Sequence, residues 1–386
     1  MSVKSFQAVL GLLLMTGLSA CALDVTGAVP SAAASDYAAK LAEYQRVHGA
    51  YQAEADAYWN AVAEKRRIRN AKRRTHERIV LDDYVLTHPP VYSGPPRPVD
   101  PNAPREPQPE RPEIPVVADF RAAAAEQWHF TPDRPASEAE FKRAYAQAAR
   151  AAGLTREQAV GVYSFETGGN GFYDTQAGIS GTRTRAISPA LGYNQLLSTN
   201  SVSLLAEHGT QFLAALSRKA AGLSGPRRQA IERKIAVLRR MIAFARRIPP
   251  KWSEYDRVAK TTPQGIGIHA ILLDVDIGPL LQVQKLATSV QFARAKGYAA
   301  PLSAAELELM NLTGDGNGID MVTMPQEMRE RVPTANFFQP NGYERNPVAR
   351  RTKTVAGLIE EIEGHVQRNA NAAGSRELAA AFTAAF

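Results

Sequence analysis

The sequence has little cysteine, little strand-like alternation and few long apolar runs, and each of these absences narrows the class of protein. Its 386 residues include one cysteine, Cys21, which excludes an intrachain disulfide. Beyond the N-terminus, no apolar stretch is long enough to span a bilayer as a helix. No motif of a nucleic-acid-binding module is present, so we expect no nucleic-acid partner. The net charge of +8 favours acidic polymers or membrane head groups instead.

The N-terminus has the pattern of a secretory signal. Lys4 precedes an apolar run from Val9 to Leu18, and the small residues of "LSAC" end at Cys21. We expect residues 1–20 to be a signal peptide, either an ordinary one with an incidental cysteine or a lipoprotein signal, and we favour the second. "LSAC" resembles the bacterial lipoprotein box, in which the cysteine becomes the lipidated first residue of the mature chain. Because Ala22 rather than aspartate follows, the resemblance implies an outer-membrane lipoprotein that faces the periplasm.

Composition divides the rest of the chain into a tether and a main domain. Residues 21–88 are helical in pattern, and the proline-dense segment "PPVYSGPPRPVDPNAPREPQPERPEIP" follows. Prolines at this density prevent a packed core and favour an extended, semi-rigid spacer. We therefore expect a lipid-anchored helical segment at residues 21–88, a linker at 89–118 and the main domain at 119–375.

A heptad stripe runs along the tether. Its members are Tyr37, Tyr44, Tyr51 and Tyr58, with Leu41, His48, Ala55 and Val62 between them. The stripe can stack on sugars, self-associate, or pack on the protein's own body, and packing is the commonest use of such a pattern. The cation-rich run at residues 64–78 is typical of a solvated face or of a surface beside anionic head groups.

The main domain is predicted to be mainly α-helical. Ser137 caps one helical pattern, and Thr155 with Gln158 forms a capping-box pattern before "REQAVGVYSFET". Further helices are expected at about residues 201–222, 226–247, 303–312 and 353–369, and "IHAILLDV" fits a strand or a buried helix equally well. Residues 205–250 form a strongly basic helical insertion, which either presents a solvated face or contacts anionic surfaces.

Glu166 in "SFETGGNGFYD" is the candidate catalytic residue. It lies in the last turn of its helix, where the macrodipole disfavours a carboxylate, and its apolar neighbours favour burial. Both effects favour a carboxyl that holds its proton near neutral pH, as a general acid requires. Gly168 and Gly169 let the backbone turn and leave room for a substrate. By itself the pattern also fits an ordinary surface glutamate.

Two motifs together resemble those of lytic transglycosylases and goose-type lysozymes. The first includes Glu166, Gly168 and Gly169, with Thr167 in place of serine. The second is "AISPALGYNQLL", with matches at Ser188, Gly192, Gln195 and Leu196. Looser counterparts of two further motifs are "LMNLTGDG", which contains Asn311, and "NGYERNPV", which contains Tyr343.

The resemblance implies a lysozyme-like α fold with a cleft for the glycan strands of peptidoglycan. Glu166 would protonate the bond between N-acetylmuramic acid (MurNAc) and N-acetylglucosamine (GlcNAc). Its carboxylate would then take the proton of the muramoyl 6-hydroxyl, leaving a 1,6-anhydro-MurNAc end. Because the N-acetyl group of the substrate assists, one carboxyl suffices, whereas most glycosidases use two. The residues implied to bind substrate are Ser188, Gln195, Tyr193, Asn311 and Tyr343, and no metal or cofactor is implied.

Three alternatives stay open. A hydrolytic lysozyme would need a second carboxylate or a placed water, and the candidate carboxylates are Asp174, Asp274, Asp276, Asp315 and Asp320. Departures from the family motifs, such as Tyr193 and Asn194 in place of two apolar residues, fit a non-catalytic peptidoglycan-binding lipoprotein with a degenerate domain. A purely structural lipoprotein is the third alternative. The segment "GDGNGID" loosely resembles a calcium loop without its closing glutamate, so we expect a glycine turn there.

Overall fold

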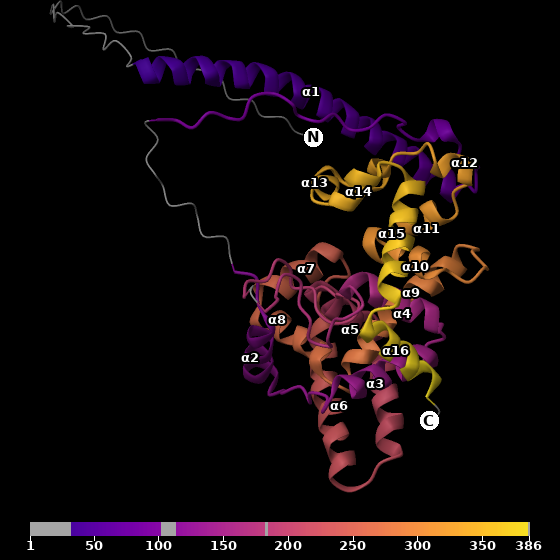
Figure 1. Cartoon of the computed structure of the whole chain (residues 1–386). Helices are drawn as coiled ribbons and strands as arrows, with labels where there is room; N and C mark the ends of the chain where they lie inside the picture. The colour runs from indigo at the N-terminus through magenta and orange to yellow at the C-terminus, as the bar shows by residue number, and fades with distance from the viewer. Residues whose placement is uncertain (1–31, 102–112, 182–183, 385–386) are drawn as a thin grey trace, which may run out of the picture. The chain divides into compact units, whose positions relative to one another are not determined.

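The computed structural model describes residues 32–101, 113–181 and 184–384, and Figure 1 shows their helices. Within these ranges no β-sheet forms, and the bridges Gln176–Leu191, Leu191–Leu196 and Pro333–Thr354 are isolated. The prediction of a mainly α fold is confirmed. Among the described residues, no single helix is long and apolar enough to cross a membrane. The predicted signal peptide and Cys21 lie outside the described residues.

Contacts divide the chain into two units. One unit is Met1–Gln52 with Tyr92–Gln108, and the other is Ala53–Val91 with Pro109–Phe386. Helix α1 (Ala32–Arg74) contributes to both units. The contacts thus divide the chain at a different place from the predicted linker, because the second half of α1 groups with the main domain.

In the smaller unit, the first half of α1 packs against the segment that begins at Tyr92. The ring of Tyr92 lies 6.3 Å from that of Tyr44, 5.3 Å from His48 and 5.3 Å from Tyr51. Three members of the heptad stripe are therefore covered by the chain itself. For this part of the stripe, the packing interpretation is confirmed.

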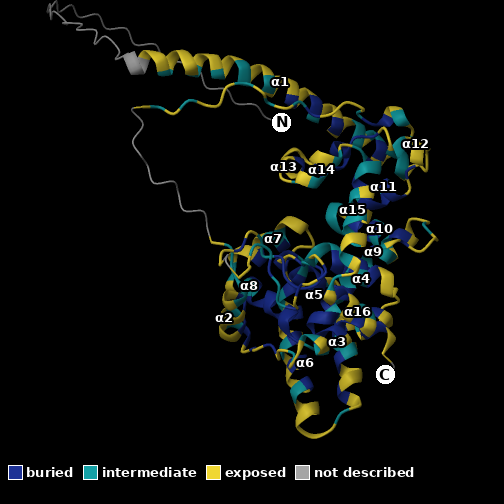
Figure 2. Ribbon diagram, in the orientation of Figure 1, coloured by how far each residue is buried: buried dark blue, intermediate teal, exposed yellow. Residues whose placement is uncertain are grey.

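The helices of the larger unit surround one main hydrophobic core, and Figure 2 shows buried residues along their facing sides. In chain order the elements are η1 (Leu81–Asp83), α2 (Val117–Trp128), α3 (Glu138–Ala151), α4 (Arg156–Thr167), α5 (Ser198–Ala221), α6 (Gly225–Ala245), α7 (Trp252–Thr261), α8 (Pro263–His269), η2 (Ala270–Leu273), α9 (Gly278–Ala295), α10 (Ala304–Thr313), α11 (Asp315–Val322), α12 (Gln326–Arg329), η3 (Thr334–Phe337), α13 (Pro340–Glu344), α14 (Pro347–Thr352), α15 (Val355–Ala370) and α16 (Ala373–Thr383). The segment "IHAILLDV" is thus mainly buried helix in α8 and η2.

The predicted capping box at the start of α4 is present. Gln158 donates its backbone N–H to Thr155 Oγ1 at 3.1 Å, and the Gln158 side chain accepts from the Thr155 N–H at 3.0 Å. At the other end Gly168 closes the helix with φ 63°, a conformation that glycine adopts without steric cost. The local sequence therefore fixes both ends of the helix that carries Glu166.

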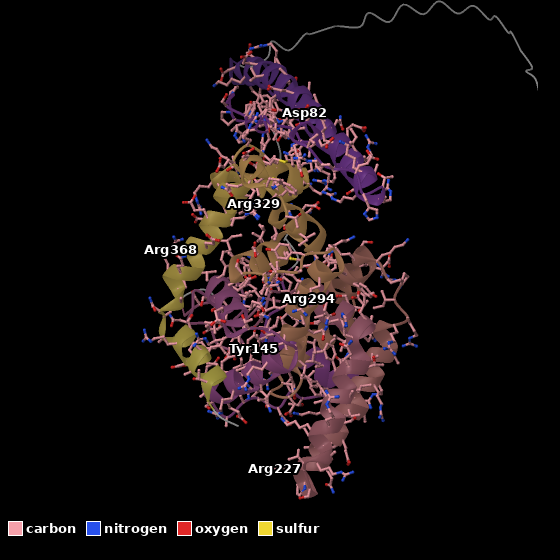
Figure 3. All side chains as sticks on the ribbon, turned by 90° about the vertical axis from the view of Figure 1, so that its right-hand side faces the viewer. Asp82, Tyr145, Arg227, Arg294, Arg329 and Arg368 are labelled. Atoms are coloured by element: carbon pink, nitrogen blue, oxygen red, sulfur yellow. The ribbon has the colours of Figure 1, made fainter. Side chains whose placement is uncertain are left out.

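The basic insertion is the hairpin of α5 and α6. The predicted apolar face of α6 is buried, including Ile231, Leu238 and Ile242. Gly209 of α5 allows close packing, because a Cβ there would lie 2.5 Å from the Ile242 side chain. Arg227 is exposed at the tip of the hairpin (Figure 3). The interpretation of a basic face with a packed apolar side is confirmed.

Arginines hold the second half of α1 against the rest of the larger unit, so the prediction of a solvated basic face is wrong for Arg66 and Arg69, whereas Arg67, Arg74 and Arg78 are exposed. Arg69 is 2% exposed and donates to the backbone carbonyls of Asp83 at 2.8 Å and Asn336 at 3.2 Å. Arg66 donates to the carbonyls of Asn336 and Phe338 at 3.1 and 2.7 Å. Guanidinium groups carry several donors in a fixed geometry, so they can saturate carbonyls that a helix surface would otherwise leave unpaired.

Candidate functional site

Glu166 is brought against α10 by close packing of two helices. A Cβ at Gly161 of α4 would lie 2.3 Å from the Cβ of Ala304, so only glycine permits this approach. Nothing lies within 4 Å of a Cβ placed on Gly168, whereas one on Gly169 would meet the Asn369 carbonyl at 2.5 Å. The expectation that both glycines leave room for a substrate is therefore wrong for Gly169, whose neighbourhood is filled by the connection between α15 and α16.

Asn311 binds the candidate catalytic carboxyl directly. Its Nδ2 donates to Glu166 Oε1 at 2.8 Å, across 145 residues of sequence. Both residues are half-buried rather than fully enclosed. The structure thus joins the first motif to the third, although the sequence match of the third motif is loose.

Glu308 is a second carboxyl at this site, and the sequence analysis did not single it out. It lies one turn before Asn311 on α10, its side chain is 0% exposed, and its carboxyl lies beside that of Glu166. Among the described residues, neither Glu308 oxygen has a hydrogen-bond partner, so this carboxyl is a buried and unsatisfied group. A hydrogen bond between the two carboxyl groups would require a proton on one of them. The available signal was an acid enclosed by leucines in "LELMNL".

The environment favours the protonated form of both carboxyls. Burial raises the pKa of Glu166 to about 7, although the neighbouring Glu308 and Asn311 side chains act in the opposite direction. Burial first, and then the neighbouring charge of Glu166, raises the pKa of Glu308 well above its ordinary value. The site therefore disfavours a negative charge on Glu308, and a pKa of about 7 lets Glu166 gain and lose a proton near neutral pH. That is the property required of a group that acts first as acid and then as base.

The second motif forms a tight loop, and its polar side chains hydrogen-bond to the backbone of the loop and of the segment next to it. Gln195 Nε2 donates to the carbonyls of Thr175 at 3.0 Å and Gly192 at 2.8 Å. Ser188 Oγ accepts from the Ala190 N–H at 3.1 Å. The structure records hydrogen bonds of Gln195 and Ser188 within the loop, and it does not bring either side chain onto Glu166. Their predicted role at the sugar stays a prediction.

The two tyrosines predicted to bind substrate are both buried. Tyr193 is 0% exposed, its ring lies 4.8 Å from that of Tyr163, and its hydroxyl donates to Glu138. Tyr343 is 5% exposed and packs 5.9 Å from the ring of Trp59 on α1. Both side chains fill cores in this structure, so neither is placed to touch a glycan. Hydrophobic periodicity alone does not distinguish a core tyrosine from a binding one.

The acids considered as second carboxylates of a hydrolase are paired elsewhere. Asp174 pairs with Arg134 at 2.9 Å, and Asp320 pairs with Arg73. Asp274 and Asp276 pair with Lys234, and Asp315 accepts from Ser289 at 2.6 Å. The calcium-like segment is helical as α11, with Asp315 and Asp320 directed to these separate partners. The expected glycine turn is thus limited to Gly314, at φ 83°.

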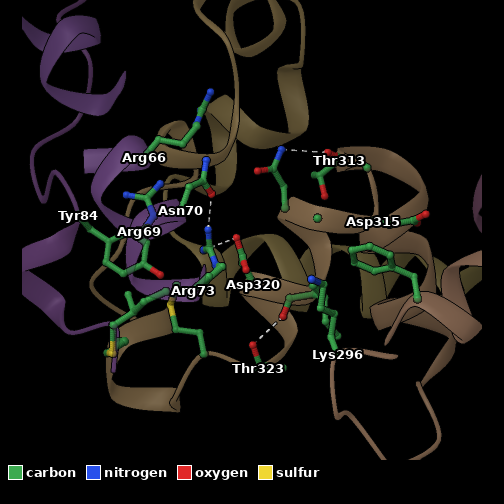
Figure 4. Close-up of a pocket in the computed structure, with 18 of the residues that line it drawn as sticks. Arg66, Arg69, Asn70, Arg73, Tyr84, Lys296, Thr313, Asp315, Asp320 and Thr323 are labelled. Carbon is green, nitrogen blue, oxygen red and sulfur yellow. Dashed lines mark hydrogen bonds and ion pairs between the residues drawn. The ribbon is translucent and has the colours of Figure 1, made fainter. Parts of the chain in front are cut away.

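A cationic cleft of about 950 Å³ lies beside the second half of α1 (Figure 4). Arg66, Arg69 and Arg73 line it, together with Lys296 and Asp320, and Glu166 is not among its lining residues. Its buried arginines donate to backbone carbonyls or to Asp320, so their contacts account for how α1 is held. The cleft is therefore a consequence of this anchoring rather than part of the carboxyl site.

Comparisons with protein-family models, with curated proteins and with solved structures found no match to this chain. The case for function accordingly rests on the carboxyl site and on the motif resemblance that led to it.

Proposed function

We propose that the protein is a peptidoglycan lytic transglycosylase that cleaves the MurNAc–GlcNAc bond and forms 1,6-anhydro-MurNAc, with Glu166 as its single acid and base. The observation that carries the proposal is the hydrogen bond of 2.8 Å from Asn311 to Glu166, in a site that raises the pKa of Glu166 to about 7. It joins two motif segments at one titrating carboxyl on a half-buried residue.

The proposed reaction uses the same carboxyl twice. In the first step the Glu166 proton moves to the glycosidic oxygen, the bond from the anomeric carbon breaks, and the N-acetyl oxygen of MurNAc bonds to that carbon. In the second step the 6-hydroxyl oxygen attacks the anomeric carbon, displaces the N-acetyl oxygen, and gives its proton to the Glu166 carboxylate. Asn311 donates a hydrogen bond to that carboxylate between the two steps, which lowers its energy.

The geometry favours a transglycosylase over a two-carboxylate hydrolase. Carboxyl groups that act as a pair on one sugar stand about 5 to 9.5 Å apart, so that the substrate fits between them. Glu308 instead lies beside Glu166 on the neighbouring helix α10 and has no exposed surface. It therefore cannot reach an anomeric carbon, and the other candidate acids are paired elsewhere.

We also propose that the mature protein is an outer-membrane lipoprotein, anchored at Cys21 and facing peptidoglycan in the periplasm. Support comes from the "LSAC" sequence and from Ala22 after the cysteine. Replacing Cys21 with serine should leave an unprocessed or unlipidated protein. Unchanged processing, with unchanged detergent-dependent fractionation, would exclude lipidation.

The catalytic assignment is tested by digesting purified sacculi with the wild type, Glu166→Gln and Asp174→Asn. The amide keeps the shape of the side chain but has no transferable proton, so Glu166→Gln should lose activity by about 10² to 10⁴-fold while it keeps its fold and sacculus binding. Asp174→Asn is the control, since that acid only pairs with Arg134. Release at the wild-type rate by Glu166→Gln would show the assignment to be wrong. A wild-type protein that binds sacculi and releases nothing would be the non-catalytic binder.

A further inference from the structure

The Glu308 carboxyl is buried and titratable, but it serves neither as nucleophile nor as base in the proposed reaction. Both of its oxygens are enclosed without a hydrogen-bond partner among the described residues, and the neighbouring carboxyl is the one that the reaction needs. Burying a carboxyl costs several kcal/mol when it is ionised and less when it is neutral. A leucine would fill this position in an apolar helix at no such cost. Packing alone therefore does not explain why a glutamate stands at this position.

We propose that Glu308 is a positioning residue that stays protonated and donates its O–H to Glu166, holding the catalytic carboxylate in place after its proton has left. This inference rests on the proposed function for its role in the reaction, but the proposed hydrogen bond can be tested in the resting protein. Asn311 donates to Oε1 of Glu166, and Glu308, one turn earlier on α10, supplies a second donor from the same helix. Two donors from one rigid helix fix both the position and the orientation of the acceptor.

Charged groups on the neighbouring elements leave Glu308 in its neutral form. From α4 it faces Glu166, which disfavours a second negative charge. From α9 the charge of Lys285 acts in the opposite direction, but its ammonium lies 3.6 Å from Asp315 at the start of α11. On α15, His365 contacts the ring of Phe165 and Asn369. No close, unpaired cation among the described residues is available to hold a Glu308 carboxylate.

Glu308→Gln and Glu308→Met are a matched pair of variants for this proposal. The glutamine amide is neutral and can still donate to Glu166, whereas methionine has a similar volume and donates nothing. A hydrogen bond to a charged group stabilises it by about one to two pKa units, so its loss should raise the pKa of Glu166 by about that amount. Since an apolar group of similar shape replaces a buried polar one, Glu308→Met is expected to fold.

The first measurement is a titration of the resting, full-length mature protein by carbon-13 NMR of its glutamate carboxyls, with the Glu166 signal assigned by its loss in Glu166→Gln. We expect the Glu166 midpoint to rise by about one to two pH units in Glu308→Met and to stay within about 0.5 unit of wild type in Glu308→Gln. An unchanged midpoint in Glu308→Met would overturn the proposal, as would a Glu308 signal that shows ionisation below pH 7.

The second measurement is the rate of sacculus digestion as a function of pH. Glu308→Met should be slower by about ten- to a hundredfold, with the alkaline limb of its profile moved upward, and Glu308→Gln should restore most of the rate. Equal losses in both variants, with an unmoved limb, would reduce Glu308 to a packing residue. If the wild type digests nothing while the NMR shift is seen, the proposed function fails and the carboxyl pair stands.

Discussion

Two buried groups of acids in the larger unit have opposite electrostatics. In one, Lys234 of α6 is 6% exposed and lies 2.8 Å from Asp133 and 3.0 Å from Asp274, with Asp276 also in contact. In the other, Glu166 and Glu308 face each other, with an amide as their nearest donor. The first group has an ammonium group in contact with its acids, and the second has an amide in that place.

The pKa shifts follow from this difference. Burial alone would raise the pKa of Asp276, but hydrogen bonds from Lys219 and Lys234 outweigh it and the net shift is downward. Asp274 is buried deeply enough that its pKa is raised even beside Lys234. For Glu166 and Glu308 nothing outweighs burial, and both pKa values rise. A paired cluster holds helices together, whereas an unpaired one retains a proton that it can transfer.

Removing the lysine should produce the largest loss of stability. Lys234→Met leaves Asp274 and Asp276 buried without their shared cation, and breaking a buried ion pair costs about 3–5 kcal/mol. Urea unfolding at neutral pH measures the change. The control is Lys219→Met: the exposed ammonium of Lys219 pairs with Asp276, which keeps Lys234 as a partner, so its loss should cost less than about 1 kcal/mol. Equal costs would mean that Lys234 does not neutralise the cluster.

The same comparison of buried and exposed charges can be made for the arginines of α1. Arg69→Met would leave the carbonyls of Asp83 and Asn336 without that donor, at a cost of about 2–3 kcal/mol. Arg67→Met is the matched control, because Arg67 is exposed and pairs only with Glu64 on its own helix. Thermal unfolding of both variants decides the point. If Arg67→Met is as destabilising as Arg69→Met, anchoring is not what the buried guanidinium provides.

The carboxyl pair should also make stability depend on pH. The pKa of Glu166 in the folded state, about 7, lies above its unfolded value, so its contribution is fully present below about pH 4.5 and is lost as the pH rises through 7. One proton gives a slope of at most about 1.4 kcal/mol per pH unit. The difference between wild type and Glu166→Gln, followed by urea unfolding from pH 4.5 to 8, isolates this contribution. A difference that is flat, or that grows with pH, would contradict it.

Tyr343→Phe should have the smallest effect. The ring packs in a cluster with Tyr58 and Val62 of α1, so removing its hydroxyl should leave the rate of sacculus digestion within about twofold of wild type and cost less than about 1 kcal/mol. The rate of sacculus digestion is the measurement that tests this prediction. A large loss of rate with normal stability would indicate that Tyr343 binds substrate after all.

The sequence predicted the helices well and the site only in part. Capping residues such as Thr155 and Gly168 act within one turn, so the bounds of α4 could be read locally. Glu308 was missed because its role depends on its contact with Glu166, and the two residues are 142 positions apart in the sequence. Tyr193 and Tyr343 were misplaced because a motif position does not report burial. The arginines of α1 were misplaced because their carbonyl partners lie on η1 and near η3.

The central claim, that one carboxyl both gives and takes the proton, is tested most directly by the chemical ends of the products. Purified sacculi are digested by the wild-type protein, and the soluble muropeptides are analysed by mass spectrometry before any chemical reduction. The account predicts 1,6-anhydro-MurNAc ends, which are lighter by one water than reducing ends, because the 6-hydroxyl rather than water delivers the proton to Glu166. Products with reducing MurNAc ends would contradict it and identify a hydrolase.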